Sequence, residues 1–228
     1  LQVTHQGVGM EVSVPIEKRQ QLIKGLFLAF YQNCPDVCFN TNRAWTASTS
    51  LIKAIFPGSK VLVCVRDVPW ILDSFEQLNT KNPFTIKALY HHKDLPTVYE
   101  RTHTLMSDEG GYVKGPLTCM KQALYSNDRD ILCVIDYDAL TKNPASTMKQ
   151  VYAFLNEPWY EHNFDDVEDS YDEFDDSANI AGLHTIRKKV EYRTRKPILP
   201  EDLWIHYSQS TFWKNDFDHI KRQMLWIE

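Results

Sequence analysis

The sequence predicts an α/β fold, with a single domain built on a central parallel β-sheet that is flanked by helices on both faces. Residues 60–65 (KVLVCV) are almost all β-branched or apolar without alternation, which is typical of a strand covered on both faces in the middle of a parallel sheet. Segments with strand-like and helix-like patterns alternate, with short turns between them. The 228 residues show no internal repeat and no interdomain linker, so we expect one domain over residues 1–228.

The first half of the chain begins with weak periodicity over residues 1–15, where we expect a loop. From Ile16 to Tyr31, apolar residues recur at helical spacing opposite Glu, Lys and Arg. The short apolar run 37–39 predicts a strand, followed by a polar turn. A helix from Trp45 to Ile55 comes next, and the Pro57-Gly58 pair ends it.

The same alternation of strand and helix continues after the strand at residues 60–65. A helix with Pro69 in its first turn should run to about Leu78. Between it and the next helix, residues 80–115 are polar and predict a helix plus a mobile excursion over the sheet edge. The later elements are a helix at 117–125, a strand at 131–136 and a helix at 144–155.

The C-terminal third is marked by a reversal of charge. Residues 160–176 hold nine Asp or Glu with interleaved aromatic residues, which predicts a solvated loop packed on the body of the protein. Residues 187–196 then carry six Lys or Arg. The Trp204 and Trp213 regions predict a helical C-terminus.

Composition excludes several classes of function. The net charge of −5 argues against a nonspecific nucleic-acid binder. No apolar run approaches the roughly 20 residues needed to cross a bilayer, which excludes a membrane span. The odd number of cysteines, five, indicates free thiols in a reducing compartment and hence a cytoplasmic protein. Cys34 and Cys38 have no second cysteine pair at zinc-ligand spacing, so we expect no metal site.

Ligands of open parallel sheets bind outside the carboxyl ends of the strands, so the turns after the predicted strands are the places to look for chemistry. Arg66 ends a wholly apolar strand, and Ser74 lies eight residues further on, in the following helix. A guanidinium fork and a hydroxyl together suit a phosphate group. A salt bridge from Arg66 to Asp67 or to another acidic residue is the alternative. The turns concerned are residues 40–43, 66–67 and 136–138.

Residues 60–75 resemble the segment of sulfotransferases that holds the 3′-phosphate of the sulfuryl donor, 3′-phosphoadenosine-5′-phosphosulfate (PAPS). In that family an apolar strand ends in Arg and a Ser follows eight positions later, as Arg66 and Ser74 do here. The segment from Ile135 to Pro144 is similar to the family's strand followed by Tyr-acidic-x-Leu. By that resemblance, Tyr137 lies against the adenine.

Two further segments are similar to bacterial sulfotransferases. Asn-Thr-Asn-Arg-Ala-Trp at 40–45 resembles the stretch before the phosphate strand, and the tail resembles theirs at 182–188 and 199–204. The resemblance runs from about residue 18 to residue 213, in the order found in the family. It implies a P-loop NTPase-like sulfotransferase fold.

The resemblance implies an enzyme that moves a sulfuryl group from PAPS to a hydroxyl or amine of a small-molecule or saccharide acceptor, without a metal. It further suggests that Arg187 and Lys188 close over the nucleotide. A solvated face paired with the acidic run is the alternative for this basic cluster. We assign Arg43 to stabilising the leaving phosphate or the transferring group, since an arginine cannot serve as the base. The base stays open among His91, His92, His103 and His184.

The sequence departs from the family pattern in two places. The glycine-containing loop that cradles the 5′-phosphosulfate is missing, and we expect it, with the first strand, upstream of Leu1. Asn40 stands where bacterial relatives commonly have Asp. The departures leave open a noncatalytic nucleotide-binding relative, and the sheet alone also suits a P-loop small-molecule kinase. No pattern identifies the acceptor or the oligomeric state.

Overall fold

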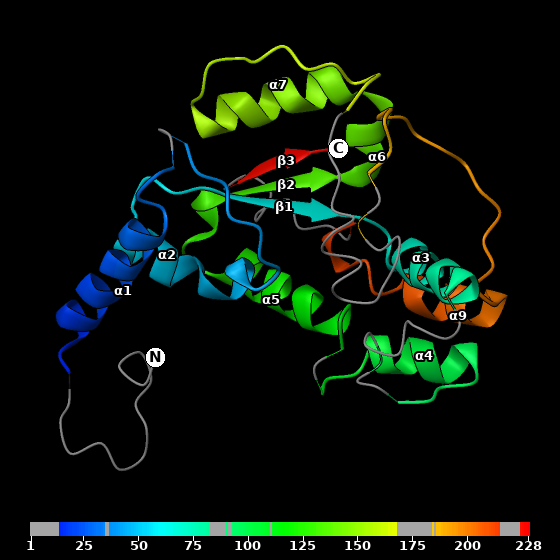
Figure 1. Cartoon of the computed structure of the whole chain (residues 1–228). Helices are drawn as coiled ribbons and strands as arrows, with labels where there is room; N and C mark the ends of the chain where they lie inside the picture. Colours follow the sequence, from blue (N-terminus) through cyan, green and yellow to red (C-terminus); the bar gives the residue numbers. More distant parts are fainter. Residues whose placement is uncertain are drawn as a thin grey trace.

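A computed structural model shows a parallel three-stranded sheet with helices on both faces (Figure 1), as the sequence predicts. The strands are β1 (Val61–Val65), β2 (Leu132–Asp136) and β3 (Leu225–Ile227), in the order β1-β2-β3. Val65 pairs with Asp136, and Ile135 pairs with Ile227. The structure describes residues 14–34, 37–82, 90, 93–109, 111–167, 184, 186–214 and 224–228.

One face of the sheet is covered by α6 (Tyr137–Lys142) and α7 (Pro144–Leu155), which lie above it in Figure 1. α7 begins with a proline, whose fixed φ suits the first helical turn. It ends at Asn156, which adopts the left-handed conformation that closes many helices (φ 60°). The core on this face comprises Cys133, Ile135, Val151 and Ile227.

The larger core lies on the other face of the sheet. There α3 (Val68–Lys81), α5 (Lys114–Tyr125) and α9 (Glu201–Ser208) bury most of the apolar residues. α4 (Val98–Leu105) packs beside α3 and starts with a capping box, in which Thr97 and Glu100 satisfy each other's backbone amides. α5 corresponds to the helix predicted at 117–125 and begins three residues earlier than expected. The 80–115 region holds α4, and residues 83–89 lie outside the described residues.

The N-terminal part of the chain forms a separate helical flank. α1 (Ile16–Phe30) confirms the predicted helix, although none of its residues is buried. It contacts the body through Phe27, whose ring centroid lies 5.8 Å from those of Trp45 and Phe56. The predicted helix from Trp45 to Ile55 is present as a 3-10 turn, η2 (Trp45–Ser48), followed by α2 (Thr49–Ile55). Residues 1–13, for which we expected a loop, lie outside the described part of the chain.

Three details of the predicted sheet are wrong. Residues 37–39 do not form a strand, because Val37 and Phe39 are exposed and the run joins no neighbouring strand among the described residues. The Trp204 and Trp213 regions are helical as predicted, but the chain then ends in the unpredicted strand β3, which adds a third strand beside β2. β1, expected in the middle of the sheet, lies at the edge of the three described strands.

Short helical turns complete the fold. η4 (Arg129–Ile131) leads directly into β2, and η5 (Phe212–Lys214) follows α9 with Trp213 buried in the larger core. The described residues contain no helix that is long and apolar enough to cross a membrane.

Candidate functional site

The carboxyl ends of β1 and β2 bring together two residues that the sequence singles out. Arg66 directly follows β1, and Tyr137 starts α6 directly after β2. The Arg66 guanidinium carbon, Cζ, lies 4.1 Å from the centroid of the Tyr137 ring. The parallel pairing of Val65 with Asp136 explains this contact, because it places the two following residues at the same edge of the sheet.

Arg66 is held by aromatic rings and has no carboxylate partner within the described residues. Its Cζ lies 5.5 Å from the centroid of Trp70, one helical turn along the chain. Its Nε is buried and finds no hydrogen-bond partner in the part of the chain that the structure describes. The alternative of a salt bridge with Asp67 is wrong, because Asp67 pairs with Lys214 (Oδ1 to Nζ, 2.5 Å). A buried donor without a partner is costly, and this one lies where a ligand of a parallel sheet would bind.

Arg195 is a second guanidinium in the same cluster, and the sequence reasoning did not select it. Its Cζ lies 5.3 Å from the Trp70 ring centroid, so both arginines contact one indole. Arg195 Nη1 forms an ion pair with Asp73 Oδ2 at 2.6 Å. The fully buried Asp73 side chain also accepts hydrogen bonds from the backbone amides of Ile198 (2.6 Å) and Leu199 (3.0 Å). The sequence signal that could have indicated this ion pair is Asp73 itself, an acidic residue on the buried side of α3.

The electrostatics of Arg195 show that like charges converge here. Burial lowers the pKa of Arg195, and the Asp73 carboxylate opposes this change. The charges of Arg66 and Arg187 lower that pKa further. Arg187, selected from the basic segment, is thus within electrostatic reach of Arg195, and the described residues provide it with no ion pair. The cluster is suited to an anion.

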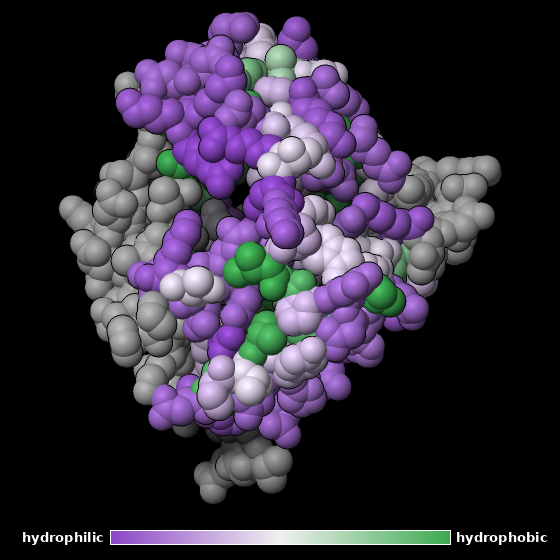
Figure 2. Space-filling view, turned by 90° about the vertical axis from the view of Figure 1, so that its right-hand side faces the viewer, coloured by the Kyte–Doolittle hydropathy of each residue, from purple (hydrophilic) through white to green (hydrophobic). Residues whose placement is uncertain are grey.

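The cluster is crossed by residues 186–200, which we call the strap. The strap is joined to the acidic loop, by which we mean residues 160–167. Backbone hydrogen bonds run from Val167 N to Lys188 O and from Val190 N to Phe164 O. Its Tyr192 ring meets Lys142 of α6 (4.4 Å from Nζ to the centroid), and Arg195 meets α3. Figure 1 shows it bowing from α6 to α9, and Figure 2 shows that side of the molecule, where hydrophilic residues dominate.

The alternative for the basic segment is pairing with the acidic run, and within the described residues one member of the segment forms such a pair. Lys189 Nζ pairs with Asp165 Oδ1 at 2.7 Å. Arg193 instead pairs with Glu191, two residues away. Lys188 uses its backbone carbonyl, and its side chain is exposed without an ion pair in the described part of the chain. The segment is therefore divided between paired surface cations and the cations near Arg66.

No contact among the described residues joins the other selected residues to this cluster. Ser74 is exposed on α3, and no described contact joins it to Arg66. Arg43 lies over the Tyr112 ring (5.2 Å to the centroid) and has no described contact with Arg66. The Asn40 side chain accepts a hydrogen bond from Trp45 Nε1 at 2.6 Å and also contacts Tyr31, so it ties α1 to η2.

The carboxylates at this edge are also engaged. Asp136 accepts hydrogen bonds from the amides of Asp138 (2.7 Å) and Ala139 and so caps α6. Asp67 pairs with Lys214. Burial alone would lower the pKa of Lys214, but the hydrogen bond that Lys214 donates to Asp67 and the charges of Asp67, Asp136 and Asp138 raise it. Among the histidines suggested as bases, His103 and His184 are exposed, while His91 and His92 lie outside the described residues.

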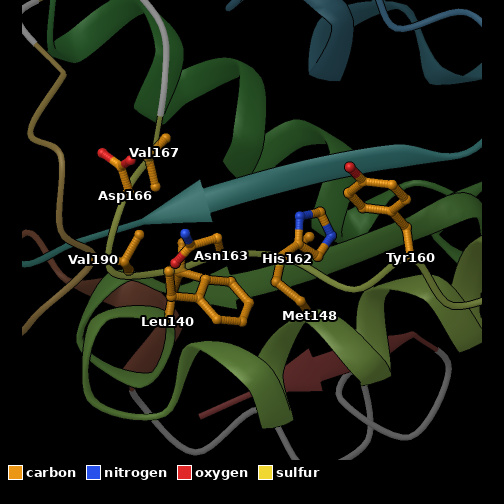
Figure 3. A pocket seen from close by; sticks show the side chains of 9 residues that line it. Leu140, Met148, Tyr160, His162, Asn163, Asp166, Val167 and Val190 are labelled. Atoms are coloured by element: carbon orange, nitrogen blue, oxygen red, sulfur yellow. The ribbon is translucent and has the colours of Figure 1, made fainter.

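A cavity of about 610 Å³ lies beside the strap, between α6, α7 and the acidic loop (Figure 3). Its wall contains the His162 ring, whose Nε2 lies 3.0 Å from the hydroxyl of Tyr152. Leu140, one turn after Tyr137, lines it from α6. Aromatic, aliphatic and polar side chains line this cavity together. The remaining lining residues are Met148, Tyr160, Asn163, Phe164, Asp166, Val167 and Val190.

The fold and the site define an α/β protein whose parallel sheet presents a cluster of cations at its carboxyl edge. The model of the sulfotransferase family matches residues 18–161, which is more than half of the chain. The protein therefore belongs to the sulfotransferase family, as the motifs indicate, and membership indicates sulfuryl transfer. No curated protein and no solved structure gives a significant match to the chain.

Proposed function

We propose that the protein transfers a sulfuryl group from PAPS to a hydroxyl or amine of a small-molecule or saccharide acceptor. Membership of the sulfotransferase family supports the transfer itself. The observation that carries the choice of donor is Arg66 at the carboxyl end of β1, a half-buried guanidinium whose buried Nε has no acceptor among the described residues. Free thiols at all five cysteines support the expected cytoplasmic location.

In this proposal, the chain's own residues bind and orient the donor. Arg66 and Ser74 bind the 3′-phosphate, Tyr137 lies against the adenine, and Arg187 with Lys188 closes over the nucleotide. PAPS supplies an activated sulfuryl group, which transfers in line through a loose transition state that depends on positioning and charge neutralisation. Arg43 remains a predicted contributor to that neutralisation, and its contact with Tyr112 holds it in place.

Calorimetric titration with 3′-phosphoadenosine-5′-phosphate (PAP) tests the donor assignment, because PAP retains the 3′-phosphate without the labile sulfate. We expect micromolar binding that falls at least tenfold in Arg66→Gln, which is about 1.4 kcal/mol. Arg193→Gln is the matched control, since Arg193 belongs to the same basic segment but pairs with Glu191. An unaltered affinity in Arg66→Gln, or no binding by the folded wild-type protein, would overturn the assignment.

A noncatalytic PAPS-binding relative is the second candidate, and Asn40 favours it. The Asn40 amide is used to hold Trp45 and Tyr31 together, which is a structural task. Transfer of radiolabelled sulfate from PAPS to a panel of phenols, alcohols, amines and saccharides separates the two candidates. Turnover with any acceptor establishes the enzyme, whereas binding of PAP without turnover favours the noncatalytic relative.

A further inference from the structure

We propose that the cavity between α6, α7 and the acidic loop is a second binding site, which takes an organic amine in its protonated form. The cavity has a volume of about 610 Å³, a size typical of sites for small molecules. Arg66, Trp70 and Arg195 are not among its lining residues. The inference therefore goes beyond the proposed function and does not depend on it.

The first step is the aromatic wall around His162. The rings of Tyr160 and Phe164, which also line the cavity, have centroids 5.2 Å and 5.5 Å from that of His162. Two supporting rings, those of Tyr152 and Trp159, each lie 5.5 Å from the His162 centroid. The Tyr152 hydroxyl also lies 3.0 Å from His162 Nε2, which fixes the imidazole. Because the faces of aromatic rings attract ammonium groups, this wall favours a cation.

The second step is the charge of the lining. Asp166 contributes a carboxylate, and the described lining residues include no Lys or Arg. The neighbouring Asp165 pairs with Lys189 at 2.7 Å, whereas no described cation pairs with Asp166. Figure 3 shows Asp166 at one end of the lining and Tyr160 at the other, with His162 between them. A carboxylate without a partner, at one end of an aromatic wall, is complementary to a positive charge.

The third step is the apolar part of the lining. Leu140 of α6, Met148 of α7 and Val190 of the strap give the cavity an aliphatic side. A bare inorganic cation gains nothing from this surface, whereas the body of an organic amine buries apolar area against it. The backbone hydrogen bond from Val190 N to Phe164 O, 2.8 Å long, ties the strap to the acidic loop. The wall is therefore held in place before a ligand binds, which lowers the cost of binding.

The test compares three probes that share a phenyl ring and a four-carbon chain: 4-phenylbutylamine, 4-phenylbutanol and 4-phenylbutanoate. At neutral pH the amine is positive, the alcohol is neutral and the butanoate is negative. In calorimetric titrations of the wild-type protein, we expect the amine to bind at least about tenfold more tightly than the alcohol, and the butanoate to bind most weakly. Equal affinities for amine and alcohol, or no binding of the amine, would overturn the proposal.

Asp166→Asn locates the charge that the amine recognises. Asp166 is exposed, so the variant should fold. We expect it to remove most of the preference for the amine and to leave the affinity for the alcohol within about twofold of the wild type. Asp165→Asn is the matched control, because it makes the same charge change one residue away at a carboxylate that pairs with Lys189. Equal losses in the two variants would trace the preference to the overall charge of the loop and refute the assigned site.

Tyr160→Leu tests the aromatic wall. The Tyr160 side chain is 67% exposed, so its replacement should leave the fold intact. We expect the affinity for the amine to fall about threefold, the size of an exposed cation–π contact. Tyr125→Leu, at a similarly exposed tyrosine of α5, is the control and should bind the amine as the wild type does. An unchanged affinity in Tyr160→Leu would contradict a role for the aromatic wall.

The amine site and the nucleotide site are separable by experiment. Arg66→Gln, which should lose PAP, is expected to keep its affinity for the amine within about twofold of the wild type. Saturation with PAP should likewise leave the amine bound. Displacement of the amine by PAP would place the amine in the Arg66 cluster and overturn the second site. A protein that binds the amine but not PAP would keep this inference and lose only the donor assignment.

Discussion

Half-buried arginines with opposite surroundings lie near the two ends of α3. Near its C-terminal end, Arg101 from α4 donates to both carboxylate oxygens of Glu76 (2.9 and 2.5 Å) and to the carbonyls of Leu95 and Pro96. Near its N-terminal end, Arg66 contacts two rings and leaves a buried Nε without an acceptor. An arginine whose three nitrogens all have acceptors supports the fold, whereas one with a buried Nε that lacks an acceptor indicates a ligand.

Arg101→Gln should give the largest loss of stability. The Arg101 and Glu76 side chains are only 11% and 13% exposed, and removal of one partner leaves the other charge desolvated. We expect the free energy of unfolding to fall by about 3 kcal/mol, measured by urea denaturation. PAP affinity should stay within twofold of the wild type. A stable variant with lost PAP binding would reverse the roles assigned to the two arginines.

Arg66→Gln is the matched substitution at the other end of α3. It breaks no described hydrogen bond or ion pair and relieves repulsion with Arg195, which offsets the lost ring contacts. We expect the free energy of unfolding to stay within about 1 kcal/mol of the wild type, the size of a cation–π contact. A loss as large as that in Arg101→Gln would show that Arg66 is a structural residue.

Thr97→Ala tests how much the capping box of α4 contributes to the stability of the region around Arg101 and Glu76. Thr97 accepts from the amide of Glu100, and the Glu100 carboxylate accepts from Thr97 N at 3.0 Å. Loss of this cap should cost about 1 kcal/mol of unfolding free energy, with no change in PAP affinity. The exposed Thr118 of α5 provides the control, since Thr118→Ala should stay within about 0.5 kcal/mol. Equal effects of the two substitutions would show that the capping box contributes no stability.

The smallest effect concerns the charges at the amino end of the sheet. The hydrogen bond from Ser50, followed by Lys53, lowers the pKa of Asp128. The carboxylate therefore stabilises the fold fully above the usual pKa of an aspartic acid, and this contribution is lost as the pH falls through the lowered pKa. In urea denaturation between pH 6 and pH 3, the stability difference between wild type and Ser50→Ala should shrink toward the acid end. A constant difference would contradict this.

Local patterns predicted much of the fold and part of the site. The apolar run of β1 and the Pro at the start of α3 are local signals, and they placed Arg66 correctly at a strand end. β3 was missed because three apolar residues near the end of the chain show no period. The position of Arg195 beside Trp70 was missed because it depends on the ion pair with Asp73. The contact of Asp73 with the strap spans a sequence separation of more than a hundred residues. Such a pairing is set by tertiary packing alone.

A crystal structure of the protein with PAP tests the central claim most directly. We predict the 3′-phosphate on the guanidinium group of Arg66, with Arg66 Nε donating to a phosphate oxygen and Arg101 still paired with Glu76. A nucleotide bound elsewhere, or a 3′-phosphate that leaves Arg66 Nε without an acceptor, would contradict the assignment of this cluster as the phosphate site.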